Sequence, residues 1–265
     1  MRTVGLDRGV YAIAVAGLAV LSLVYRDFAP TWQPLPAWIP GREMWGYGSG
    51  LILLAAGAGL CFPRTALPSA LTIGAYLAIC ALLSASPIVL KPLSIGSWYA
   101  FFEALSALVG VWILYAMLRR RSEITEAPPF ASERAVRAAR VLFGLTCVFY
   151  GASHFTYAEY TAGMVPGWLP ARMGFAYFTG LGHIAAGIGI AVGILPRLAA
   201  TLEATMMSLF GLLVWVPSLW ANPTPAWATP PRTQWSEIVV NLVLAASAWI
   251  VATSLRTRPW GFILR

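Results

Sequence analysis

Charged residues are scarce in this chain. Only 11% of its 265 residues are Asp, Glu, Lys or Arg, whereas 59% are hydrophobic. A soluble domain carries roughly 25% charged residues. The composition therefore excludes an ordinary water-soluble fold and indicates a chain built for lipid.

Cysteine is also rare. Cys61, Cys80 and Cys147 all lie inside apolar segments, and none belongs to a Cys-x-x-Cys pair. Because no outward loop is expected to carry a thiol, thiol–disulfide exchange with extracytoplasmic proteins is not expected. The three side chains are expected to pack as small apolar groups.

Histidine occurs only twice, at His154 and His183. Neither is spaced with a carboxylate or a thiol as a ligand set, so no metal site is predicted. A haem held by both would need ligands at similar depth on different helices. Counting along the helices places His183 roughly 15 Å below His154, which argues against a bis-histidine haem.

Long apolar runs fill most of the chain. A helix needs about 17–25 such residues to cross the hydrocarbon core. Eight runs qualify as predicted spans: Val10–Tyr25, Met44–Phe62, Leu67–Leu83, Trp98–Leu118, Ala135–Phe155, Phe175–Leu195, Leu198–Trp220 and Trp235–Leu255.

Basic residues are unevenly distributed between the two sides that eight spans would create. Only five of the eighteen fall on the side away from the termini: Arg26, Arg42, Lys91, Arg172 and Arg232. The positive-inside rule then places both termini in the cytoplasm, in a bacterial inner membrane. Contact with anionic headgroups accounts for the net charge of +8, and no basic face is left for nucleic acid.

The opposite side is rich in tryptophan, which favours the headgroup level of a membrane. The residues are Trp32, Trp38, Trp45, Trp98, Trp168, Trp220, Trp227 and Trp235. They form either an aromatic belt or an outer cap over a cavity.

The two halves of the sequence resemble each other at a nearly constant offset. Matching pairs include Trp38/Trp168, Pro40/Pro170, Arg42/Arg172, Gly57/Gly187, Pro63/Pro196, Arg64/Arg197, Thr72/Thr205 and Glu103/Glu237. Such self-similarity is typical of a tandem duplication.

The predicted fold is therefore an all-α integral membrane protein with eight transmembrane helices in two tandem four-helix repeats. The first repeat covers residues 1–121, a cytoplasmic linker covers 122–134, and the second repeat covers 135–265. Because each repeat has an even number of spans, both insert in the same orientation, related by an axis along the membrane normal. A functional site is expected between the repeats.

Polar residues within the spans are the candidate site residues. An ionisable group at mid-bilayer costs roughly 2.5–3.5 kcal/mol on insertion scales, so it needs a partner, a cavity or a function. The candidates expected in the outer half of the membrane are His183, Glu103, Tyr177, Glu237, Asn241 and His154. Glu203 is expected near the inner end of its span, paired with Arg197 or water. Glu103 and Glu237 could instead be interface residues, and His183 could donate a single interhelical hydrogen bond.

The span that contains His183 is rich in small residues. Pairs such as Gly182/Ala186 and Gly189/Gly193 would let a partner helix approach closely. Gly187 shares the face of His183, so the imidazole is expected to point into the bundle. Its counterpart in the first half is Leu53, which predicts an asymmetric site carried mainly by the second half.

This pattern resembles the DoxX/DoxD-like group of small membrane proteins. The resemblance rests on a polar residue followed by a Gly-rich span and a Pro-Arg turn, here His183, Gly187, Gly193, Pro196, Arg197, Ala199 and Ala200. It implies four-helix modules with both ends cytoplasmic and an association with membrane redox systems, including quinone-linked sulfur oxidation. The group often has Glu where this chain has His183, and it supplies no catalytic residues to transfer.

Three functions are compatible with the sequence. The leading hypothesis is a quinone-interacting or redox-associated membrane subunit, at most part of an oxidoreductase. In it, His183 and Glu103 would bind the quinone oxygens and exchange protons, and electrons would come from a partner subunit. The alternatives are a small-molecule or lipid transporter that uses the repeat interface, and a non-catalytic membrane scaffold.

Overall fold

The computed structural model describes residues 5–29, 33, 35, 38–122, 128–220 and 230–261. Within these ranges, seven helical segments are long and apolar enough to cross a membrane: Leu6–Tyr25, Ala66–Leu90, Ile95–Arg120, Glu133–Thr156, Arg172–Val192, Pro196–Ser218 and Pro231–Ser254. The chain is an all-α, multi-pass membrane protein, as the composition predicted.

The helices of the described residues fall into longer and shorter ones. The longer ones are α1 (Leu6–Tyr25), α2 (Arg42–Leu60), α3 (Ala66–Leu83), α5 (Tyr99–Arg120), α6 (Glu133–Thr156), α8 (Arg172–Val192), α9 (Pro196–Phe210) and α11 (Pro231–Ser254). The shorter ones are α4 (Ala85–Leu90), η1 (Ile95–Trp98), η2 (Pro129–Ala131), α7 (Ala158–Met164), the π-helix η3 (Gly211–Trp215) and α10 (Val216–Ser218).

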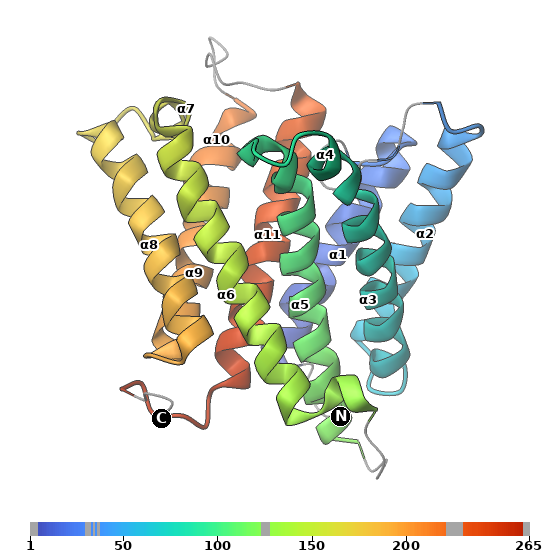
Figure 1. Ribbon diagram of the computed structural model, residues 1–265. Helices are drawn as coiled ribbons and strands as arrows, with labels where there is room; N and C mark the ends of the chain where they lie inside the picture. The colour runs from blue at the N-terminus through green and yellow to red at the C-terminus, as the bar shows by residue number, and fades with distance from the viewer. Residues whose placement is uncertain are drawn as a thin grey trace.

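The predicted span Met44–Phe62 corresponds to α2, which is not among the seven candidate spans. This helix has 19 residues, but it opens with Arg42 and Glu43 and is rich in glycine, which lowers its mean hydropathy. It packs along α1 over its length (Figure 1).

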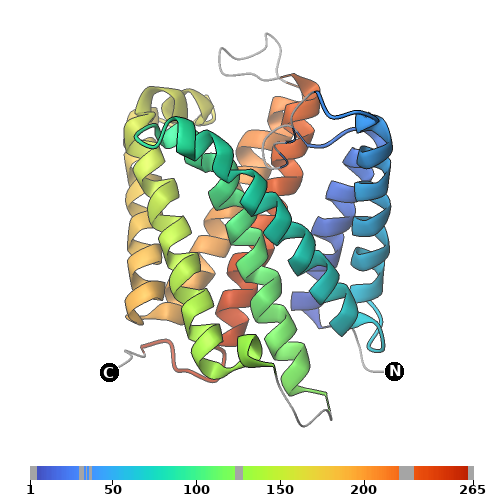
Figure 2. The same ribbon diagram turned by 45° about the vertical axis from the view of Figure 1, so that its right-hand side comes forward.

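Two central helices, α5 and α11, pack against each other. Figures 1 and 2 show α1, α2 and α3 on one side of this pair, and α6, α8 and α9 on the other. The start of α1 and the end of α11 lie at one end of the bundle, and the short helices α4 and α7 lie at the opposite end. Of the seven candidate spans, α11 is the most buried.

Exposed tryptophans gather on the segments near the α4 and α7 end. Trp38, Trp45, Trp168, Trp220 and Trp235 are exposed, and Trp98 is half-buried against Phe102. This exposure agrees with an aromatic belt at a membrane interface. Trp32 and Trp227 lie outside the described residues.

Helix α8 approaches α6 through glycines. A Cβ at Gly187 would lie 2.4 Å from the carbonyl oxygen of Gly144, and one at Gly180 would lie 2.9 Å from His154 Cβ. Close helix packing was predicted for this span at pairs such as Gly182/Ala186, with Gly187 facing the bundle, and Gly187 does lie against α6. Gly182 instead faces the side chain of Met206, 3.4 Å away, because it lies on the α9 side of the helix.

Asp27 ties the end of α1 to α2 and α11. Its carboxylate lies 2.6 Å from Arg42 Nε and 3.0 Å from Arg232 Nη2, and it accepts the backbone N–H of Phe28 at 2.8 Å. Burial alone would raise the pKa of Asp27. The Phe28 amide and the two guanidinium groups outweigh burial and lower this pKa below its ordinary value.

This lowered pKa predicts a pH-dependent stability. The contribution of Asp27 to the free energy of unfolding is fully present above the ordinary aspartate pKa of about 4. It is lost as the pH falls from there through the lower pKa that Asp27 has in the folded protein. Asp27→Asn should cost about 2 kcal/mol at neutral pH and flatten the acid limb of the stability profile. Thermal unfolding in detergent between pH 3 and pH 7 measures both effects, with Glu159→Gln, at an exposed carboxylate, as the control. An unchanged acid limb in Asp27→Asn would contradict the assignment.

Candidate functional site

A buried histidine–carboxylate pair joins α8 to α9. His183 Nδ1 lies 2.8 Å from Glu203 Oε1, and the two side chains are 1% and 2% exposed. His183 lies ten residues before Gly193 and Glu203 ten residues after it. The chain reverses at Gly193 and Leu195, which have positive φ, and Pro196 starts α9. The two residues therefore meet at the same depth.

The expectation that Glu203 pairs with Arg197 is wrong. Arg197 donates instead to the backbone carbonyls of Arg256 and Arg258, and its guanidinium lies 4.0 Å from the centre of the Trp260 ring. His183 and Glu203 are equally far from the turn of the α8–α9 hairpin, and this equal distance was the signal in the sequence that they could pair.

The pair is suited to holding a proton. An isolated charge at such a buried position would be costly, so each side chain depends on its hydrogen bond to the other. An imidazole and a carboxyl group in direct hydrogen-bond contact are side chains that can pass a proton between them.

One carboxylate oxygen of this pair is left over. Glu203 Oε2 is buried and has no hydrogen-bond partner among the described residues. The thiol of Cys147, on α6, approaches Glu203 as a weak hydrogen-bond donor, without forming a hydrogen bond of normal geometry to this oxygen. A buried acceptor without a partner costs about 1–3 kcal/mol, so this oxygen is a candidate contact for a ligand.

His154 lies directly beside His183. The ring centroids are 5.1 Å apart in an edge-on arrangement, with 77° between the ring planes. The predicted difference of depth is therefore wrong, because α8 begins beyond the end of α6, with α7 between them in the chain. A haem between the two imidazoles remains excluded, now because the rings are in contact and leave no room for a macrocycle.

Hydrogen bonding indicates the tautomer of His154. Nδ1 lies 3.0 Å from Thr179 Oγ1 and 3.3 Å from the Ala176 carbonyl oxygen. Thr179 donates its own proton to the Phe175 carbonyl, 2.8 Å away. Nδ1–H is therefore the donor, which leaves His154 Nε2 as an acceptor.

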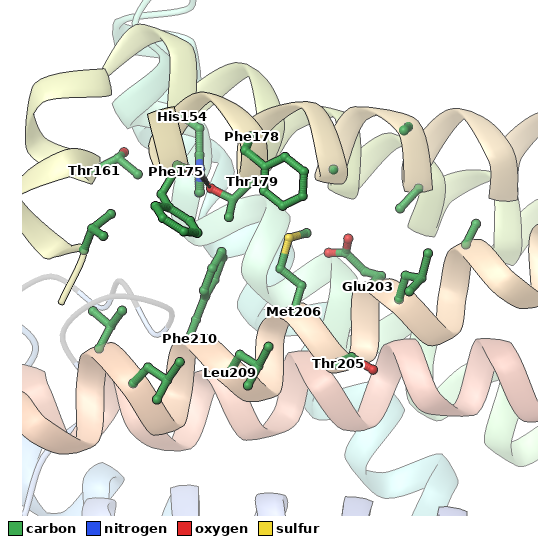
Figure 3. A pocket seen from close by; sticks show the side chains of 18 of the residues that line it. His154, Thr161, Phe175, Phe178, Thr179, Glu203, Thr205, Met206, Leu209 and Phe210 are labelled. Atoms are coloured by element: carbon green, nitrogen blue, oxygen red, sulfur yellow. Dashed lines mark hydrogen bonds between the residues drawn. The ribbon is translucent and has the colours of Figure 1, made fainter. Parts of the chain in front are cut away.

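A largely apolar cavity of about 760 Å³ lies between α8 and α9, and both His154 and Glu203 line it. Figure 3 shows these side chains with Thr179, Phe175 and Met206 around the hollow. Its rim is exposed: Phe178 is 71% and Leu202 57% accessible. In a membrane such a rim faces lipid, so the cavity is open to molecules dissolved there.

The π-helix η3 borders the same cavity. Leu213, Val214 and Trp215 of this segment line it. Pro217 follows two residues later, lacks an N–H and would clash with the carbonyl of residue 213 in a regular α-helix. Widening the preceding turn accommodates it, and π segments of this kind are frequent at functional sites.

The other predicted site residues form a second cluster or lie apart. Glu103 on α5 and Glu237 on α11 interact electrostatically, and Glu103 Oε2 is buried without a hydrogen-bond partner among the described residues. Asn241 donates to the Glu237 carbonyl of its own helix, at 2.9 Å. Tyr177 is 42% exposed and stacks on Phe155, away from both clusters.

Tyr150 connects the two clusters. Its hydroxyl lies 3.0 Å from Ser106 Oγ on α5, and its ring centroid lies 5.9 Å from that of His183. Tyr150 also interacts electrostatically with both Glu103 and Glu203. His183 and Glu103, which were predicted to bind the oxygens of a quinone, thus have one tyrosine between them.

The cavity is lined by residues 154–215 and lies within the second half of the chain rather than between the halves. Within the described residues, no group of three His, Cys, Asp or Glu side chains could hold a metal ion.

A family model described as a domain of unknown function (DUF8561) matches residues 142–252. The matched stretch includes the whole His154–His183–Glu203 cluster. No curated protein and no solved structure matches the chain. The resemblance to DoxX/DoxD-like proteins stays a prediction.

Proposed function

We propose that the chain is built from two four-helix repeats with eight spans, α2 included, in a DoxX-like arrangement with both termini in the cytoplasm of a bacterium. The helix contacts support this, since α1 packs on α2 as α6 packs on α8, and α3 on α5 as α9 on α11. The matching helices α2 and α8 also both begin after a left-handed residue, Gly41 and Ala171.

The cavity between α8 and α9 would bind a lipid-soluble molecule with a hydrogen-bonding head, of the quinone class. The observation that carries this proposal is Glu203. One of its oxygens is held by His183, the other has no hydrogen-bond partner within the described part of the chain, and the side chain lies in the wall of an apolar cavity open to lipid. Ligand sites of this size combine apolar walls with a few placed polar groups.

The polar groups fit both redox states of such a head. A quinol hydroxyl can donate to Glu203 Oε2 or to His154 Nε2, and a quinone carbonyl can accept a proton held by Glu203. Oxidising a quinol releases two protons and two electrons. The His183–Glu203 pair would accept one proton and His154 Nε2 the other, and the electrons would pass to a redox partner subunit, since the chain would have no redox centre of its own.

Quinone bound per protein after mild purification tests this proposal. Solvent extraction and mass spectrometry should find about one quinone per chain in the wild type, and Glu203→Gln should lower this at least about tenfold. Glu159→Gln, at an exposed carboxylate of α7, should have no effect. Quinone no higher than in a control membrane protein, or full retention in Glu203→Gln, would refute it.

The lateral opening of the cavity favours a second candidate, a transporter of lipids or small apolar molecules. Counterflow of a labelled lipid-soluble compound in liposomes distinguishes it, because a redox subunit would bind such a compound without moving it across.

A further inference from the structure

A second pocket, of about 200 Å³, lies at the end of the bundle where α1 and α3 begin and α5 ends. Arg8, Arg121, Asp7 and Ser122 supply its polar side chains. It lies in the first half of the chain and shares no residue with the cavity between α8 and α9. The two sites are therefore independent.

Arg8 is the unusual feature of this pocket. The residue is only 8% exposed, and its buried Nε has no hydrogen-bond partner among the described residues. Among the described residues, the hydrogen bond that it makes runs from Nη2 to the Cys61 carbonyl, at 3.4 Å. A guanidinium has five N–H donors and cannot lose its charge. A buried one with so few partners indicates an anion that is bound in the functional protein.

The backbone adds positive potential at the same place. Gly5, which precedes α1, and Asp7 in the first turn of α1 line the pocket together with Ala66 and Leu67 of α3, so the first turns of two long helices meet there. First-turn N–H groups that have no other partner attract anions. At α3 the N–H of Ala66 already donates to the Phe62 carbonyl at 2.9 Å, so Leu67 is the residue of α3 that can offer its N–H here.

Among the described residues that line the pocket, Asp7 is the one with an opposing charge. It is buried in the wall of the pocket, yet within the described part of the chain it forms no ion pair with Arg8 or Arg121. Two arginines and two helix N-termini therefore outweigh one carboxylate, and the pocket keeps a net positive potential.

We infer that this pocket binds a phosphate group. Arginine forks match phosphate oxygens in pairs, and the Ser122 hydroxyl can donate a further hydrogen bond. Leu67, Leu114 and Met117 give the pocket an apolar wall, and it lies at the ends of the spans, where phospholipid headgroups gather. A phospholipid headgroup and free phosphate present the same chemistry to this site.

Binding to the purified full chain in detergent separates these sources. The probes are dioctanoyl phosphatidic acid, dioctanoylglycerol with the same acyl chains but no phosphate, and inorganic phosphate, each followed by intrinsic fluorescence. Phosphatidic acid that binds at least about tenfold tighter than the other two identifies a lipid headgroup site. Equal binding of phosphatidic acid and inorganic phosphate, with no binding of dioctanoylglycerol, identifies a soluble phosphate site.

The variants test the assigned residues. Arg8→Gln and Arg121→Gln should each weaken phosphate binding at least about tenfold, and added salt should weaken it in the wild type. Arg64→Gln, at an exposed arginine of the neighbouring α2–α3 turn, should bind normally. Because Arg121 is exposed, its substitution is informative even where Arg8→Gln fails to fold. Phosphatidic acid binding no better than dioctanoylglycerol, or unweakened in Arg121→Gln, would overturn the inference.

Discussion

Glu203→Ala and His183→Leu are each expected to lower the free energy of unfolding by about 3–5 kcal/mol, whereas the double variant should lose far less than either. The pair is almost fully buried, so removing one member leaves the other without its hydrogen bond in an apolar wall. Removing both members removes that penalty. The first half of the chain has apolar residues at both equivalent positions. Leu53 matches His183 and Ala70 matches Glu203 in the sequence, and each is 1% exposed.

Unfolding in a titration with a denaturing detergent, followed by far-ultraviolet circular dichroism, measures this cycle. The same three proteins separate stability from function, because all three should lack bound quinone while the double variant remains folded. Losses that simply add in the double variant would show that the two side chains do not stabilise each other. A double variant that keeps its quinone would place the ligand elsewhere.

The sequence was sufficient for the membrane class because that class depends on composition and run length. Scarce charge and apolar runs of helical length predict spans whatever their partners are. Composition was not sufficient to decide whether α2 crosses the membrane. Position within the chain and the match to α8 suggested a span there, but Arg42, Glu43 and the glycines make its composition alone indecisive.

The candidate site was harder to predict because it depends on how helices are offset along their axes. Assigning His154 and His183 to different depths assumed that α6 and α8 end level with each other. In fact their rings touch. Glu203 was missed for the same reason, since its depth follows from the tight reversal at Gly193 and Leu195. The sequence shows which residues are polar, but whether two polar residues come into contact depends on how far the helices are offset along their axes.

Gly187→Leu is expected to have the other large effect, the loss of the α6–α8 contact and with it the folded second half. Even a single Cβ at Gly187 would lie 2.4 Å from the Gly144 carbonyl oxygen and 2.9 Å from the Val148 amide nitrogen. These are backbone atoms, so no side-chain rotation relieves the clash, and the two helices must move apart. Overpacking typically costs 1–3 kcal/mol, occasionally more, and we expect at least about 3 kcal/mol here because α6 carries His154 and Tyr150 against His183.

Gly174→Ala is the matched control on the same helix, because its Cβ would lie 3.7 Å from the Ala171 Cβ, an ordinary contact. That change should be neutral or stabilise the protein by up to about 1 kcal/mol, through the better helix propensity of alanine. Size-exclusion profiles and detergent unfolding of both variants measure the difference. A Gly187→Leu protein as stable as Gly174→Ala would mean that α6 and α8 do not pack through these glycines. If Gly187→Leu is instead unstable while the His183→Leu/Glu203→Ala protein is stable, the polar pair serves the ligand and the glycines hold the helices together.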